Sequence, residues 1–303
     1  MDIKNIKKID IHAHANPFPE YAPKWHLGYP WISAEELISF YDKLGVEKGV
    51  LLPLESTESH FQTFNSCDIK YVVDKYPDRF LWFCSVDPRS CYNKDTADLS
   101  FLMNHYKSLG AKGVGEVTAQ LYVDDPKMDN LFYHASLCDM PVTIHLSPRI
   151  GHTYGMVDDL GLPRLEKMLK KHKNLKILGH SQCFWAELSS DVQEKQRTGY
   201  PKGKVTEGKI AHLMRNYEGL YCDFSAGSGL NALSRDPEYA ARFIEEFSDR
   251  ILLGYDICNS FNTHQFDYED FLTKMLDDGY ISPENYYKFV RGNAIKLLNL
   301  EDK

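Results

Sequence analysis

Short runs of apolar and β-branched residues recur along the whole chain, and amphipathic stretches separate them. Runs that are short and apolar throughout are typical of strands buried on both faces of a sheet. Eight such runs are present. They span residues 8–15, 46–54, 79–86, 111–119, 141–147, 175–181, 219–226 and 250–258.

The stretches between these runs carry helix signals. Ser33 followed by Glu36 forms a capping box before a helix that ends at Gly45. The dipeptides 236–237 (Asp-Pro) and 282–283 (Ser-Pro) each place a capping side chain before a proline at the first helical position. The chain is therefore expected to alternate between strands and helices.

This alternation predicts an α/β fold with parallel strands, because each crossover needs a helix to return the chain. With 303 residues, eight units fit a (β/α)8 TIM barrel in one domain over residues 1–303, with an additional C-terminal helix. An open doubly wound sheet is the alternative. It requires a glycine-rich turn after the first strand, and residues 12–20 contain no glycine.

Two connections are unusually long. Residues 15–32 are rich in proline and aromatic residues, and residues 182–205 are polar. Both follow strands, so in a barrel both lie on the C-terminal face, where long loops act as lids or binding loops. For residues 182–205 a contact in a homo-oligomer fits equally well.

Charge and composition limit the partners. The net charge of −8 argues against nucleic acid or an anionic membrane surface. No segment reaches the ~20 apolar residues of a membrane span, and the N-terminus resembles no signal or transit peptide. The seven cysteines are scattered and form no C-x-x-C pair, as expected of free thiols in a reducing compartment. We expect a cytoplasmic protein that acts on a small molecule.

Metal-capable side chains occur where the predicted strands end. His12 and His14 lie two residues apart on the first strand and leave the same face, which in a barrel is the interior. Asp10 is expected on that face one layer deeper, as a supporting group. Active sites of barrels form at the C-terminal strand ends. Further candidates at matching positions are Glu116, His145, His180 and Asp256.

This series resembles the amidohydrolase superfamily, whose barrels carry H-x-H on strand 1, histidines on strands 5 and 6, and aspartate on strand 8. Residues 289–300, "FVRGNAIKLLNL", resemble the closing helix of the amidohydrolase-related family 2 branch. That branch includes decarboxylases of the aminocarboxymuconate-semialdehyde and resorcylate type, together with uncharacterised metal-dependent hydrolases.

The resemblance implies that His12, His14, His145 and Asp256 surround a divalent cation. Such ligands suit Zn²⁺, with Mn²⁺ as an alternative. His180 would act as general acid/base or polarise the substrate, and Asp256 would also take a proton from water.

The fourth strand departs from the best-known two-metal members, which use a carboxylated lysine there. This chain has Glu116, and Lys112 lies at the beginning of the strand, out of reach of the C-terminal end. TatD-like nucleases place a glutamate in this region and bind two metals. Glu116 is thus either a bridging ligand of a second cation or a supporting partner in a one-metal site.

Substrate-binding candidates come from the loops. Arg149 follows His145 by four residues, close enough to hold a carboxylate with two hydrogen bonds, although a surface arginine is the simpler reading. The remaining candidates are His152, Trp25, His26 and Trp185.

Together these features favour a metal-dependent hydrolase that cleaves an amide, ester or lactone bond of a small carboxylated metabolite. A non-oxidative decarboxylase, a carbon–carbon lyase on the same site, is the alternative. A barrel that only binds a ligand would be expected to lack a metal ligand, and none is missing. A TatD-like phosphodiesterase is disfavoured by the acidic chain.

Overall fold

The computed structural model describes residues 3–24, 28–58 and 64–301, in which strands alternate with helices. The strands are β1 (Lys8–Ala13), β2 (Val46–Leu51), β3 (Phe80–Trp82), β4 (Val114–Val117), β5 (Val142–Ser147), β6 (Met156–Val157), β7 (Ile177–His180), β8 (Leu220–Phe224) and β9 (Ile251–Leu253). The α-helices are α1 (Ala34–Leu44), α2 (Ser66–Lys75), α3 (Ser90–Asn93), α4 (Ser100–Ser108), α5 (Pro126–Leu137), α6 (Pro163–Lys171), α7 (Gln182–Ala186), α8 (Lys209–Asn216), α9 (Ala226–Ser234), α10 (Pro237–Glu246), α11 (His264–Asp277), α12 (Pro283–Tyr287) and α13 (Asn293–Leu298).

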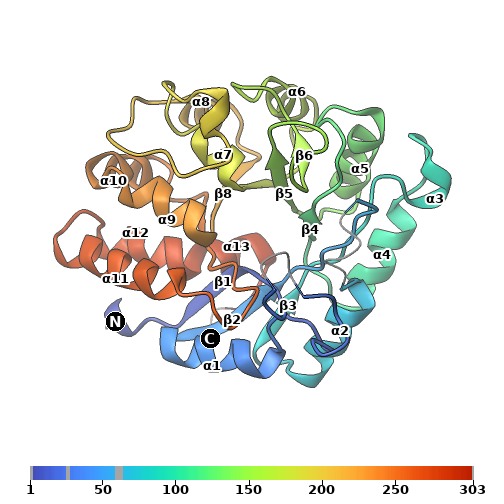
Figure 1. Cartoon of the computed structure of the whole chain (residues 1–303), viewed down its shortest axis with the longest axis horizontal. Coiled ribbons are helices and arrows are strands. Elements are labelled where there is room, and N and C mark those ends of the chain that lie inside the picture. Colours follow the sequence, from blue (N-terminus) through green and yellow to red (C-terminus); the bar gives the residue numbers. More distant parts are fainter. Residues whose placement is uncertain (1–2, 25–27, 59–63, 302–303) are drawn as a thin grey trace.

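The strands close into a parallel barrel with the helices outside it (Figure 1). One sheet has the order β1-β2-β3 and the other β4-β5-β7-β8-β9. Two parallel bridges join them, Cys84 with Val114 and Ala13 with Ile257. The predicted (β/α)8 fold is confirmed.

Each of the eight predicted ranges contains one barrel strand. The short strand β6 was not predicted; it pairs with the end of β5, off the barrel path. The helix caps agree with the sequence signals. Ser33 and Glu36 form the capping box of α1, and Asp236 caps α10 ahead of its proline.

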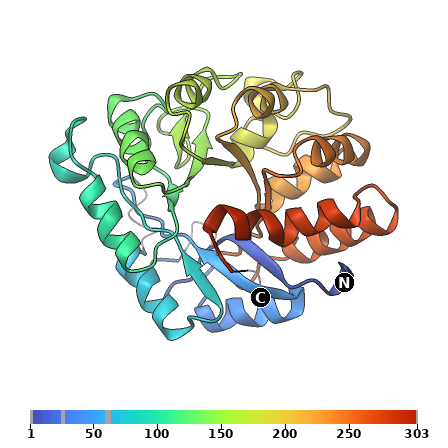
Figure 2. The same cartoon turned by 180° about the vertical axis from the view of Figure 1, so that it is seen from behind.

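Apolar residues form two cores. The larger one lies between the strands and the surrounding helices. The smaller one fills the barrel interior and includes Ile9, Leu178 and Leu252, which pack with Leu297 and Leu298 of α13. Figure 2 shows α13 in front of the first strands, where it covers this end of the barrel. The polar site residues are therefore left at the opposite, C-terminal end.

The pairing of β1 with β2 shifts in register between Asp10 and Ala13. Ile9 and Ile11 pack in the interior, whereas Asp10 between them accepts a hydrogen bond from Tyr41 of the outer helix α1. Strict alternation from His12 predicted Asp10 on the interior face, and this is wrong because the irregularity reverses the alternation. Asp10 instead binds the backbone N–H groups of His12 and Tyr255.

The two long connections differ in structure. In the described part of residues 15–32 there is neither helix nor strand. Residues 182–205 contain α7 and a short 3₁₀ helix, Glu194–Gln196. The fully buried Arg197 fastens this excursion: its Nη1 donates to the Asp158 carbonyl at 3.0 Å, and its Nε lies 3.3 Å from Glu187 Oε1. Within the described ranges, none of the helices has the length and apolarity needed to cross a membrane.

Candidate metal centre

Side chains from five strand ends meet at the C-terminal end of the barrel. Because the strands are parallel, all of their C-terminal ends open at the same side. The residues brought together are His12 and His14 from β1, Glu116 from β4, His145 from β5, His180 from β7 and Asp256 after β9.

The closure of the barrel brings Asp256 to the first strand. The Asp256 N–H donates to the His12 carbonyl at 2.8 Å, and the His14 N–H donates to the Ile257 carbonyl at 3.2 Å. Ala13 and Ile257 form the parallel bridge between these segments. Residues that are far apart in the sequence thus become neighbours through backbone hydrogen bonds.

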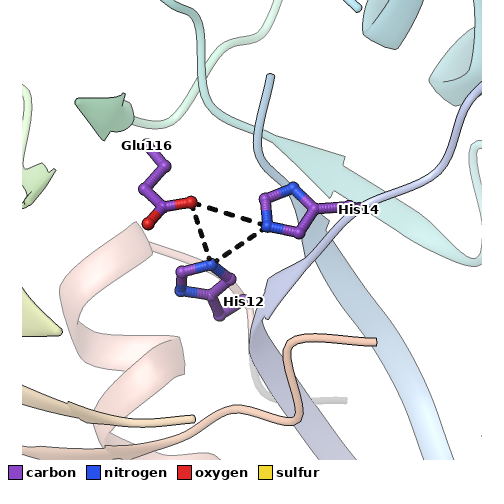
Figure 3. A group of neighbouring side chains, drawn as sticks. All are labelled: His12, His14 and Glu116. Carbon is purple, nitrogen blue, oxygen red and sulfur yellow. Dashed lines mark hydrogen bonds and ion pairs between the residues drawn. The ribbon is translucent and has the colours of Figure 1, made fainter. Parts of the chain in front are cut away.

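Four donor atoms converge at the centre of this end. His12 Nε2 and His14 Nε2 are 3.3 Å apart, and Glu116 Oε2 lies 3.5 and 3.6 Å from them (Figure 3). Asp256 Oδ1 lies 3.2 Å from His14 Nε2 and 3.8 Å from His12 Nε2. Tetrahedral ligands about 2.1 Å from an ion are about 3.4 Å apart. The spacing of the His12, His14 and Glu116 atoms therefore fits a single cation, and Asp256 Oδ1 lies beside the two histidine nitrogens.

Each of the two histidines on β1 is held through its other ring nitrogen. His12 Nδ1 lies 2.6 Å from Asp223 Oδ2, and His14 Nδ1 lies 2.9 Å from the Leu52 carbonyl oxygen. Both partners accept hydrogen bonds, so in each ring Nδ1–H donates and Nε2 is directed at the centre. Such partners orient the ring and raise its basicity as a ligand.

Glu116 contacts a second group of candidate ligands. Its Oε1 accepts from His145 Nδ1 at 2.6 Å, whereas Oε2 is directed at His12 and His14. Glu116, His145 and His180 form a further group whose donor atoms lie within 4.8 Å of one another. The carboxylate therefore lies between two sets of ligands.

His180 is held in a similar way. Its Nδ1 lies 2.7 Å from Ser225 Oγ, and its Nε2 lies 3.8 Å from Asp256 Oδ2. His180 Nε2 is thus directed toward Asp256 and the group of metal-ligand candidates.

The electrostatics of the site favour positive charge. Burial opposes ionisation of His12, but Asp223 and Asp256 raise its pKa well above the usual value. Burial likewise opposes ionisation of Glu116 and Asp256, yet the neighbouring histidines lower the pKa of both carboxyl groups. His180 differs, because burial and the nearby His12 lower its pKa to about 4. Two ionised carboxylates thus face a ring that is neutral at neutral pH.

A cavity of about 340 Å³ opens above these groups. His145, His180 and Asp256 line it, together with loop residues that include Tyr154 and Tyr200. Its volume suits a small molecule.

None of the predicted substrate-binding residues that the structure describes lines this cavity. Arg149 and His152 are exposed on the loop after β5, outside the cavity lining. Trp185 is buried and stacks on Phe224, with ring centroids 4.0 Å apart, in the core behind the site. Trp25 and His26 lie outside the described residues.

Sequence reasoning missed several groups that support or line the site. Asp223 could have been found from the sequence, because an aspartate inside the apolar run 219–226 indicates a buried charge with a specific partner. Ser225, Tyr154 and Tyr200 carry no such signal, since ordinary loops contain these residue types.

A (β/α)8 barrel with histidines and carboxylates at its C-terminal strand ends defines a class of metal-dependent enzymes. The chain belongs to the amidohydrolase family, whose model matches residues 9–300. No curated protein matches the sequence.

Solved structures share the fold over nearly the whole chain. An uncharacterised TIM-barrel protein from Bordetella bronchiseptica has a TM-score of 0.65 and 19% identity, covering 97% of this chain and 99% of that chain. A protein assigned as a 2-pyrone-4,6-dicarboxylic acid hydrolase from Pseudomonas putida has a TM-score of 0.66 and 13% identity, with 98% and 99% coverage. The manganese-bound 5-carboxyvanillate decarboxylase from Novosphingobium aromaticivorans has a TM-score of 0.60 and 17% identity, with 98% and 97% coverage. The similar proteins thus include both reaction classes.

Proposed function

We propose that the protein is a metal-dependent hydrolase that cleaves an ester, lactone or amide bond of a small metabolite. One observation carries this proposal: the two oxygens of Glu116 face different ligand groups, Oε2 toward His12 and His14, and Oε1 toward His145. A carboxylate placed in this way fits a bridge between two cations. Paired metal sites of this kind are widely used for hydrolysis.

The first cation would be held by His12, His14 and Glu116, whose spacing fits tetrahedral ligands, with Asp256 as a further ligand beside the two histidines. A second cation would replace the proton that His145 Nδ1 donates to Glu116 Oε1, with His180 nearby. Zn²⁺ suits this donor set, and Mn²⁺ also accepts it. When bound, such a cation lowers the pKa of a water molecule and polarises a carbonyl oxygen.

The protein groups have separate roles in this proposal. Asp256, which is ionised and 22% exposed, accepts a proton from the attacking water. His180, whose Nε2 lies 3.8 Å from Asp256 Oδ2, takes up that proton from Asp256 and passes it to the leaving group. Ser225 holds the opposite nitrogen of this ring and keeps Nε2 directed at the substrate.

A non-oxidative decarboxylase is the second candidate, and the similarity of the barrel to a manganese-bound 5-carboxyvanillate decarboxylase favours it. In that reaction His180 would protonate the carbon that loses CO₂. One cation would be sufficient, and Glu116 would then act by orienting His145.

The experiment that tests the proposal combines metal analysis with product analysis. Protein purified without added metal or chelator would be analysed for its elements, and aryl esters, lactones and hydroxybenzoates would be offered as substrates. We expect two equivalents of metal in the wild type and hydrolysis of esters or lactones. Glu116→Gln should lower the metal content to one equivalent or less, whereas the exposed control Glu218→Gln should retain two. One equivalent of metal together with CO₂ release from a hydroxybenzoate would replace the hydrolase with the decarboxylase.

A further inference from the structure

Tyr154 is the aromatic residue most closely associated with the proposed centre. It lies between β5 and β6, and its ring centroid is 4.4 Å from that of His145, at an interplanar angle of 43°. It lines the cavity together with His180 and Asp256. The ring therefore stands beside the groups that would act on a substrate.

The hydroxyl of Tyr154 makes no hydrogen bond to the described part of the chain, unlike the hydroxyls of the buried Tyr41 and Tyr268. Tyr41 donates to Asp10 at 2.8 Å, and Tyr268 donates to the Phe224 carbonyl at 2.9 Å. In the described part of the chain the Tyr154 hydroxyl has no protein partner, and it is not sealed from the cavity. A tyrosine hydroxyl in a largely buried position normally finds an acceptor, so a molecule in the cavity is the natural one.

The segment that carries Tyr154 is held firmly. The Gly151 N–H donates to Gln120 Oε1 at 2.6 Å, and Gln120 Nε2 donates to the Thr153 carbonyl. On the other side, Ser147 Oγ and Thr153 Oγ1 are 3.0 Å apart. The loop is thus fastened to the ends of both β4 and β5.

Gly155 allows this segment to approach His145. Its φ of +112° is disfavoured for residues with a side chain. A Cβ at this position would lie 2.7 Å from His145 Cδ2 and 2.8 Å from the His145 carbonyl oxygen. The close approach brings the ring of the preceding Tyr154 against the His145 ring in a tilted contact, so the hydroxyl is held in a fixed position.

We propose that Tyr154 is a catalytic residue whose O–H donates a hydrogen bond to the substrate oxygen that gains negative charge in the transition state. The inference rests on the proposed hydrolysis. The hydroxyl keeps its proton, because the tyrosine stabilises charge without transferring a proton, and a donor fixed before the reaction does this most effectively. Tyr200 also lines the cavity, but it is 51% exposed and its hydroxyl is hydrogen-bonded to Gln182, so it is neither buried nor free to bind a substrate.

The first test compares Tyr154→Phe with the wild type in the hydrolysis of p-nitrophenyl acetate and dihydrocoumarin. We expect kcat to fall by about 100-fold, as for loss of one oxyanion donor, with KM and metal content nearly unchanged. Tyr133→Phe removes a hydroxyl from the exposed face of α5 and should leave both constants unchanged. Equal kcat values for Tyr154→Phe and the wild type would overturn the inference.

The second test does not require turnover. Binding of phenylphosphonate, a tetrahedral anion, would be measured by calorimetry on the metal-loaded wild type and variants. Loss of the hydrogen bond should weaken binding by about tenfold or more in Tyr154→Phe only. If no probe is hydrolysed but this loss is found, the donor role stands and the proposed hydrolysis fails. Equal binding by wild type and Tyr154→Phe, or no binding by the wild type, overturns the donor role itself.

Discussion

Asp223 and His12 are 211 positions apart in the sequence, and Asp223 Oδ2 lies 2.6 Å from His12 Nδ1. Both side chains are fully buried. The other oxygen, Asp223 Oδ1, is buried without a hydrogen-bond partner among the described residues. Burying such an atom is costly, so the position is better explained by its effect on His12 than by stability.

Replacing Asp223 should weaken metal binding. Asp223→Asn keeps the shape of the side chain but removes the negative charge behind His12, so the ring becomes a poorer ligand. We expect metal affinity to fall by about 10- to 100-fold, measured by competition with a chromophoric chelator. Asp95→Asn changes an exposed aspartate and should leave affinity unchanged. Wild-type affinity in Asp223→Asn would show that the contact does not tune the site.

Gly254 should not tolerate a side chain. A Cβ there would lie 2.6 Å from Ser225 Cβ, 2.9 Å from Asp223 Oδ1 and 3.1 Å from His12 Cβ. We therefore expect Gly254→Ala to lower the free energy of unfolding by about 1–3 kcal/mol, as overpacking does, and to reduce bound metal.

Gly199→Ala is the matched control, because its Cβ would meet only the Gln196 carbonyl oxygen at 3.7 Å. Urea denaturation and elemental analysis of both variants measure the effect. Equal stability and metal content in the two variants would contradict the close packing around His12.

His180→Asn should separate catalysis from metal binding. The variant loses the proton donor, and activity on whichever substrate is turned over should fall by about 100-fold or more while metal content is retained. Ser225→Ala leaves the ring in place but frees its Nδ1, so a smaller fall is expected. A fully active His180→Asn would remove this residue from the mechanism.

The ionisation of Asp129 should make the free energy of unfolding depend on pH in the acid range. Partial burial opposes its charge, but hydrogen bonds from Lys171 and His172 of the neighbouring segment lower the pKa of Asp129. Asp129 therefore binds a proton more readily in the unfolded chain than in the folded one. Its contribution to the free energy of unfolding is present at neutral pH and is lost as the pH falls below about 4. Its size is about 1 kcal/mol, since the side chain is only 27% exposed.

The check is denaturant unfolding of Asp129→Asn and the wild type between neutral and acid pH. The difference between them should shrink on acidification, and Asp95→Asn should follow the wild type throughout. A difference that is constant with pH would show that the carboxylate charge is not involved.

The sequence by itself determined the order of strands and helices and hence the barrel. This information is local. Apolar runs mark buried strands, and the capping box at Ser33 and the cap at Asp236 form hydrogen bonds to residues only three positions further on. The histidines at strand ends were also readable, because parallel strands all present their C-terminal ends on one side of the barrel.

Only the tertiary structure decided which side chains support and surround the centre. Asp223 reaches His12 because β8 and β1 lie on either side of β9 in the closed barrel. Tyr154 reaches His145 because Gly155 allows a close approach and Gln120 holds the loop. Trp185, a predicted substrate-binding residue, packs instead in the core against Phe224. Such positions depend on contacts between distant segments and on loop conformation, neither of which leaves a periodic pattern in the sequence.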